Sequence, residues 1–439
     1  MISKKIPAAL FIVAGVIAGV AALRPDPSTD VAAVPLPDPR VMLAGGYGYD
    51  PLDEVVGQWR DRVIENPTDN LSRVQLGTSL IGLARENGDL DLYPRAESQL
   101  RRAVAAAPTD PVAVTALAGA LSAQHEFVEA RRLIAPLAAE RPADLSLQAA
   151  LVDVQIDLGD YDAALALLEA MVETAPDSVA TLSRQARVAA LTGDNEAAVG
   201  FAREMLLLGA DVGLRPADAA GLWFQLGFFQ YQAGAVDEAE TSVRAALTID
   251  PDHGASREFL GKVLVAQGRY EEAADTYEAI LAEGPVADLH GLLAEVYTAL
   301  GRDDEAAEQV RLGLALAEDQ IGVYPAERRH LAGFFADHDP ATFLRLMEED
   351  VATREDIGGL DLLAWAQYLN GEVDEAQATM DRALALGTEE ATLLFHAGMI
   401  EAEVGEPDRA RDLLESALDL NPGFDLSDVA LARATLADL

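Results

Sequence analysis

The stretch that decides the fold is residues 223–251, WFQLGFFQYQAGAVDEAETSVRAALTIDP. Apolar residues at helical spacing lead to Gly234, and a second amphipathic run follows and ends near Pro251. Because glycine and proline interrupt helices, this pattern predicts two short helices joined by a glycine-centred turn. Gly227 and Ala239 are small where the two helices would cross, so the pair can pack closely.

The same pattern recurs along most of the chain. A turn glycine is followed five residues later by alanine at seven places, and successive turn glycines are 34, 41, 34, 33, 70 and 34 residues apart. The step of 70 is two periods plus two residues, and the step of 41 contains an insertion near residues 209–216. A fixed period of this length indicates stacked structural repeats. The seven pairs are Gly159/Ala164, Gly193/Ala198, Gly234/Ala239, Gly268/Ala273, Gly301/Ala306, Gly371/Ala376 and Gly405/Ala410.

The repeated unit resembles the tetratricopeptide repeat family, most clearly in Trp223-x-x-Leu226-Gly227 with Ala239 and Pro251. The resemblance implies an all-α, right-handed α-solenoid of about ten helical hairpins, spanning residues 51–439. A leading amphipathic helix is expected at 52–65 and a capping helix at 425–438. The predicted units are 70–110, 111–144, 145–178, 179–213, 220–253, 254–286, 287–320, 321–356, 357–390 and 391–424.

Two of these units depart from the pattern. In unit 111–144, His125 and Glu126 stand where the turn glycine belongs. Unit 321–356 is degenerate and keeps little beyond helical periodicity. In a stacked array each unit contacts its neighbours, so we expect stability to accumulate from neighbouring pairs and these two units to be the weakest.

The amino terminus has the layout of a targeting segment. Lys4 and Lys5 precede an uncharged run over residues 6–23, which predicts a signal peptide or an uncleaved signal-anchor helix in residues 1–23. Residues 24–50 are rich in proline and glycine, which predicts an extended linker between the membrane and the body. The solenoid is thus expected on the periplasmic or extracytoplasmic side, anchored in the inner membrane or secreted after cleavage.

Composition narrows the possible functions. The chain has 439 residues, 32 basic and 74 acidic side chains, a formal charge of −42 and no cysteine. Disulfides and cysteine nucleophiles are excluded. Nucleic acid and anionic membrane surfaces are unfavourable ligands, because phosphates are bound by clustered lysine and arginine. The acidity has two possible origins, a salty habitat or a basic partner. No catalytic, metal-binding or cofactor motif is present, so we expect no enzyme activity, no metal and no cofactor.

Recognition by a surface therefore remains. In such a solenoid the first helix of each unit lines the concave face. Aromatic, methionine and charged residues at the positions facing this groove are candidates for binding a protein or peptide partner. The alternative is that some of these side chains fill the gaps between units. The candidates are Phe224, Phe228, Tyr231, Glu258, Lys262, Asp361, Trp365, Tyr368, Phe395 and Met399.

These features predict a non-catalytic interaction scaffold or assembly chaperone that binds a partner segment in its concave groove. Two alternatives remain open. The chain could be a structural anchor that associates with itself, or a regulatory subunit of an envelope enzyme complex. Cytochrome-assembly and outer-membrane machineries use similar solenoids, and a shared fold does not choose between such roles.

Overall fold

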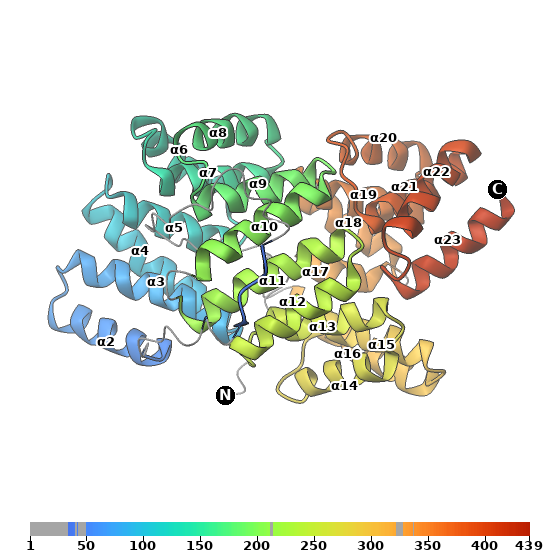
Figure 1. Cartoon of the computed structure of the whole chain (residues 1–439), viewed down its shortest axis with the longest axis horizontal. Coiled ribbons are helices and arrows are strands. Elements are labelled where there is room, and N and C mark those ends of the chain that lie inside the picture. The colour runs from blue at the N-terminus through green and yellow to red at the C-terminus, as the bar shows by residue number, and fades with distance from the viewer. Residues whose placement is uncertain (1–33, 40–41, 43–49, 211–213, 322–327, 337) are drawn as a thin grey trace.

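A computed structural model describes residues 34–39, 42, 50–210, 214–321, 328–336 and 338–439, and over these ranges every regular element is helical (Figure 1). The predicted all-α solenoid is confirmed. No helix of the described ranges is long and apolar enough to cross a bilayer. The predicted targeting segment, residues 1–23, lies outside the described residues.

The helices follow one another as antiparallel pairs. Helix α2 (Leu52–Glu65) precedes the pairs, and α23 (Leu426–Asp438) follows them and packs on α21 and α22. The pairs are α3 (Asn70–Asn87) and α4 (Leu92–Ala106), α5 (Pro111–Ser122) and α6 (Phe127–Glu140), α7 (Leu145–Leu158) and α8 (Tyr161–Thr174), α9 (Val179–Leu191) and α10 (Asn195–Ala210), α11 (Pro216–Gln232) and α12 (Val236–Ile249), α13 (Gly254–Ala266) and α14 (Tyr270–Leu281), α15 (Ala287–Ala299) and α16 (Asp303–Ile321), α17 (Arg328–Ala332) and α18 (Pro340–Val351), α19 (Ile357–Leu369) and α20 (Val373–Ala383), and α21 (Ala391–Val404) and α22 (Pro407–Leu420).

Local chemistry explains where these helices begin and cross. Asp144 caps α7, because its carboxylate accepts a hydrogen bond from the Leu147 backbone N–H. Gly227 lies where α11 crosses α12: a Cβ there would come within 2.9 Å of the Val243 side chain and 3.1 Å of the Ala239 carbonyl oxygen. Close packing of the pair therefore depends on the missing side chain, as the sequence pattern predicts.

The two irregular units are irregular in structure as well. His125 has a backbone φ of 59° and takes the left-handed turn conformation that glycine supplies in regular units. In unit 321–356 the first helix, α17, has five residues and is followed by a short 3-10 turn, Gly333–Phe335.

The solenoid closes on itself, which the repeat pattern does not predict. Turns after α7 and α9 lie against the loops before α19 and α21, as Figure 1 shows where green α9 approaches the orange helices. The Tyr161 hydroxyl accepts a hydrogen bond from the Ile357 backbone N–H at 2.7 Å. The Thr388 hydroxyl donates to the Leu191 carbonyl at 2.5 Å, and the Asn195 amide donates to the Glu389 carbonyl at 2.9 Å. We call this line of contacts the seam.

The two irregular units meet each other beside the seam. The rings of His125 and His330 have centroids 6.0 Å apart, and the Arg354 guanidinium lies 5.3 Å from the centre of the Phe127 ring. This contact joins two units that are not neighbours in the sequence, in addition to the neighbour contacts expected from the repeats. Their departure from the repeat consensus coincides with a contact between units far apart in sequence.

The described part of the linker lies against the body. Met42 is buried, and the Trp223 indole N–H points to its sulfur at 3.3 Å. Leu36 packs on the same apolar cluster, and Arg203 donates a hydrogen bond to the Val34 carbonyl. An extended linker standing free of the solenoid is therefore wrong for residues 34–39 and 42, because apolar side chains in this segment bury against α10 and α11.

Candidate functional site

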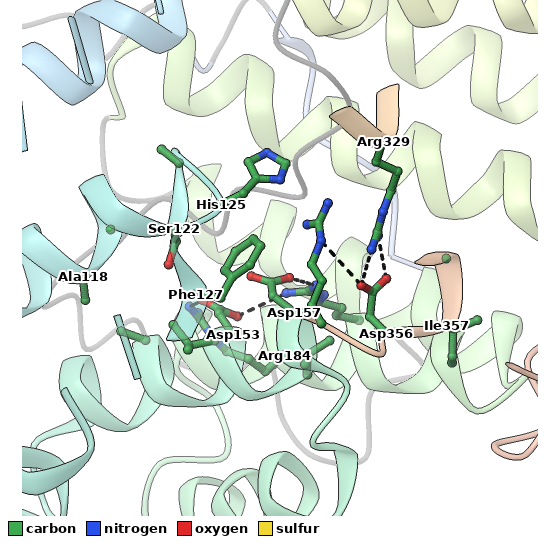
Figure 2. Close-up of a pocket in the computed structure, with 18 of the residues that line it drawn as sticks. Ala118, Ser122, His125, Phe127, Asp153, Asp157, Arg184, Arg329, Asp356 and Ile357 are labelled. Atoms are coloured by element: carbon green, nitrogen blue, oxygen red, sulfur yellow. Dashed lines mark hydrogen bonds and ion pairs between the residues drawn. The ribbon is translucent and has the colours of Figure 1, made fainter. Parts of the chain in front are cut away.

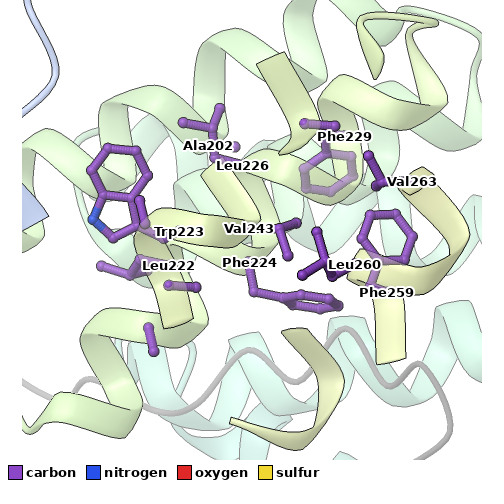
Figure 3. Close-up of a cluster of buried hydrophobic side chains, with 14 of the residues drawn as sticks. Ala202, Leu222, Trp223, Phe224, Leu226, Phe229, Val243, Phe259, Leu260 and Val263 are labelled. Atoms are coloured by element: carbon purple, nitrogen blue, oxygen red, sulfur yellow. The ribbon is translucent and has the colours of Figure 1, made fainter. Parts of the chain in front are cut away.

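The predicted stripe on α11 surrounds an aromatic ring of the next unit. Phe259 of α13 is 2% exposed and is drawn with Phe224 in Figure 3. Its ring centroid lies 5.7 Å from that of Phe224, 5.8 Å from that of Phe228 and 5.2 Å from that of Tyr231. The three residues therefore fill the space between α11 and α13, which is the alternative role considered for them. Phe259 was not among the candidates, although it sits one position before the core residue Leu260.

Phe228 and Tyr231 nevertheless keep part of their surface accessible, whereas Phe224 is only 5% exposed. Burial raises the pKa of Tyr231 to about 12, against the opposing effect of a hydrogen bond with Asn421 across the coil. Phe224 is thus a core residue, and the accessible apolar surface of this unit is that of Phe228 and Tyr231.

The charged candidates of α13 form a small cluster with a residue that sequence reasoning missed. Burial raises the pKa of Glu258 to about 7, and nearby Asp288 raises it further while Lys262 lowers it. Burial also raises the pKa of Asp288 to about 7, and Lys262 again opposes the shift. All three side chains are half-buried. Asp288 lies two residues into α15, in the stretch where the first helix of a unit faces its neighbour, and that position was the available signal.

The candidates on α19 form a stack of rings with a second missed residue. The Trp365 ring is 4.8 Å from Tyr368 at 15° and 4.4 Å from His396 at 18°. His396 contacts Asp361 through Nδ1 at 2.8 Å, and both residues are buried. Burial lowers the pKa of His396, but Asp361 raises it, and the net shift is upward. Asp361 therefore holds an internal histidine in place.

The candidates on α21 are covered by the carboxyl-terminal helix and the loop before it. Phe395 is fully buried, with its centroid 5.8 Å from that of Phe424. Met399 is 6% exposed, and the Thr435 hydroxyl of α23 points to its sulfur at 3.4 Å. Four of the predicted groove residues do not lie on an open surface, because packing covers them: Phe224, Asp361, Phe395 and Met399. The accessible candidates are Phe228, Tyr231, Glu258, Lys262, Trp365 and Tyr368.

A cavity of about 340 Å³ lies elsewhere, between the first helices of the early units and the degenerate unit (Figure 2). On one wall, Arg184 pairs with Asp153, and Arg187 bonds Asp157 at 2.5 Å. None of these residues was a candidate from sequence, since isolated charges on separate helices carry no motif.

On the opposite wall, Arg329 bonds Asp350 and Asp356, each at 2.6 Å, and Arg354 bonds Asp350 at 3.0 Å. Burial raises the pKa of Asp356, but the adjacent Arg329 guanidinium lowers it to below its usual value. These groups come from α17, the last turn of α18 and the residues after α18, so the irregular unit supplies this wall.

Comparison with known proteins agrees with this architecture. Residues 149–211 and 362–423 match one tetratricopeptide repeat model, and residues 230–293 match another. These segments are thus similar to tetratricopeptide repeats. No match to a curated protein sequence was found.

Several solved structures are similar in fold. The human IFIT1 dimer with m7Gppp-AAAA has a TM-score of 0.50 and 15% identity, covering 76% of this chain and 76% of that one. The human IFIT1 dimer with PPP-AAAA gives 0.49 and 16%, covering 76% and 77%. The Cut9 and Hcn1 hetero-tetramer of the APC/C gives 0.38 and 14%, covering 87% and 67%. At such identities the likeness concerns the fold alone.

Proposed function

We propose that the chain is a non-catalytic scaffold or assembly chaperone that holds a segment of a partner protein on its concave side. The surface is that of Phe228, Tyr231, Glu258, Lys262 and Asp288, here called the α11–α15 surface. Tetratricopeptide repeats generally mediate protein–protein interaction, which supports this class of function. The proposed location is extracytoplasmic, and its support is the charged and apolar pattern of residues 1–23.

One observation carries the choice of partner chemistry. Glu258 and Asp288 are two half-buried carboxylates with raised pKa values, and the cation acting on both is Lys262. A lysine or arginine arriving from a partner would stabilise the ionised forms, while Phe228 and Tyr231 offer apolar contact beside them. The occupant is therefore an extended segment that combines basic and apolar side chains.

The test uses the full-length chain and two labelled peptides, one alternating lysine with leucine and one alternating glutamate with leucine. Fluorescence anisotropy measures binding at 150 mM salt. The lysine peptide should bind and the glutamate peptide should not. Because a chain of charge −42 attracts any cation, the decisive variant is the double substitution Glu258→Gln and Asp288→Asn, which should weaken binding about tenfold.

The matched control makes the same two types of substitution in an exposed part of α16, Asp304→Asn with Glu308→Gln. This control should change affinity less than twofold. Equal affinities for the two double variants would reject the α11–α15 surface. Crosslinking in the native envelope with the same variants would then identify the partner, and amino-terminal sequencing of the mature chain would test the location.

A further inference from the structure

The cavity of Figure 2 concentrates positive charge within a strongly acidic chain. Its lining contains five arginines and three aspartates, whereas the whole chain has 32 basic and 74 acidic residues. A guanidinium removed from water is costly unless a counter-charge or a ring of acceptors compensates it. Each lining arginine that is removed from water therefore needs an identified partner.

Aspartates compensate four of the five arginines. Arg184 and Arg187 pair with aspartates of α7, and Arg329 and Arg354 pair with Asp350. Arg85 differs, because no carboxylate of the described residues forms an ion pair with it. Its hydrogen-bond partner is Tyr93, a neutral group, and desolvation lowers the pKa of Arg85. Arg85 also keeps exposed surface, and the Asp218 carboxylate acts on it without forming an ion pair with it in the described structure. One cation of the lining thus has no carboxylate in direct contact.

The lining also divides into two chemically different ends. The part contributed by residues 85–127 carries cationic and hydroxyl groups but no carboxylate, whereas all three aspartates belong to residues 153–157 and 356. Thr115 lies in the first part, and its hydroxyl oxygen is buried with no hydrogen-bond partner among the described residues. A buried hydroxyl that can both donate and accept is costly to leave unsatisfied.

We propose that this end of the cavity binds a small organic anion through its carboxylate or phosphate group, with Arg85 as the principal cation and the Thr115 hydroxyl as a further donor. A guanidinium presents paired N–H groups whose geometry fits the oxygens of both anions. The volume of about 340 Å³ is within the usual range for small-molecule sites. The site shares no residue with the α11–α15 surface, so this proposal does not depend on the proposed function.

The position of the cavity gives the ligand a structural effect. Its walls come from α3 to α9 on one side and from α17 and the residues after α18 on the other. An anion bound at the end formed by residues 85–127 would be held by the folded cavity and not by the unfolded chain. Binding should therefore raise the thermal stability of the chain with increasing ligand concentration.

Isothermal titration calorimetry on the full-length chain tests the site with two probes, citrate and inorganic phosphate, each at constant ionic strength set with sodium chloride. One of them should bind saturably at a ratio of one to one and raise the melting temperature. Tight citrate binding would indicate an organic acid, and tight phosphate binding would indicate a phosphate or phosphorylated compound. Arg85→Gln should weaken the binding at least tenfold.

The matched control is Arg102→Gln, which removes an exposed arginine from α4 outside the cavity lining. It should leave the affinity unchanged. Thr115→Val provides a second test within the cavity, should Arg85→Gln fail to fold, and it should weaken binding about three- to tenfold. The proposal is overturned if neither anion binds above the chloride background, or if the folded cavity variants bind as the control does.

Discussion

Two groups of turns share one sequence signature but have different surroundings. Gly159 and Gly193 lie at the seam, where an added Cβ would overlap the carbonyl oxygens of Glu355 and Gly387. Gly301 has the same left-handed conformation, with φ of 71° against 80° at Gly159, and nothing lies within 4 Å of its Cβ position. The repeat pattern thus specifies the conformation of the turn. Contacts between distant units determine how strongly a side chain added at the turn would destabilise the fold.

The largest loss of stability should come from the charge cluster of Arg329, Asp350 and Asp356, which lies in the degenerate unit. Arg329→Met removes the guanidinium that pairs Asp350 and Asp356, whose side chains are 8% and 16% exposed. Two carboxylates would then be left without this cation in a largely buried site, so unfolding free energy should fall by about 3–5 kcal/mol. Urea denaturation measures the loss.

The control for this variant is Arg345→Met, because Arg345 is 57% exposed and its ion pair within the described part of the chain is with Glu349 on its own helix. Its effect should stay below about 1 kcal/mol. Acid titration adds a second readout. The folded pKa of Asp356 lies below its usual 3.8, so its stabilisation is present above pH 3.8 and is lost as the pH falls through the lower folded value. Arg329→Met should therefore make the unfolding free energy fall less steeply at acidic pH. An unchanged pH dependence would contradict the pairing of Arg329 with Asp356.

The second effect compares the two groups of turns directly. Gly301→Ala should cost about 1–2 kcal/mol, the usual penalty for a side chain in the left-handed region. Gly159→Ala carries the same penalty and adds the overlap with the Glu355 carbonyl, so it should cost at least about 1 kcal/mol more than Gly301→Ala. Equal losses of stability for the two variants in thermal denaturation would show that the Glu355 carbonyl does not restrict a side chain at position 159.

The smallest effect concerns one hydrogen bond. Tyr161 follows its turn glycine by two residues, as Tyr270 follows Gly268, and only the first is hydrogen-bonded across the seam in the described structure. Tyr161→Phe should destabilise the chain by about 1 kcal/mol, the net value of such a bond. Tyr270→Phe should lie within about 0.5 kcal/mol of the parent. Similar losses of stability for the two variants would show that the Tyr161–Ile357 hydrogen bond does not stabilise the closed coil.

The repeat architecture was predictable because its signals are local and periodic. Gly227, Ala239 and Pro251 define one hairpin, and the same spacing located the helical pairs on either side. The capping helix was predictable for a similar reason, since its apolar residues follow helical spacing. Helix termini and crossing points depend on residues a few positions apart, which a single sequence displays.

The closure of the coil was not predictable in this way. Tyr161 and Ile357 are 196 residues apart, and a contact of that separation has no period. The available signals were negative ones, the replacement of glycine at His125 and the loss of the repeat pattern before Arg329. Both departures look like weak units when each is viewed alone. Their mutual contact becomes visible only when the path of the coil is known.

The candidate residues were partly predictable. Helical spacing placed Phe224 and Phe228 on adjacent positions of α11, but it cannot distinguish a side chain that faces solvent from one that meets the next unit. Phe259 decides that question here, since it occupies the gap and draws Phe224 into the core. The same holds for Phe395, which Phe424 covers.

The seam also bears on how the chain folds as it is synthesised. Its first half, around residues 158–195, leaves the ribosome long before its second half, around residues 355–389, has been translated. Translation proceeds at about 5–20 residues per second, so the early hairpins wait roughly ten to forty seconds for the residues that complete them. During this delay the early side of the seam lacks the hydrogen-bond partners that Ile357, Thr388 and Glu389 later supply.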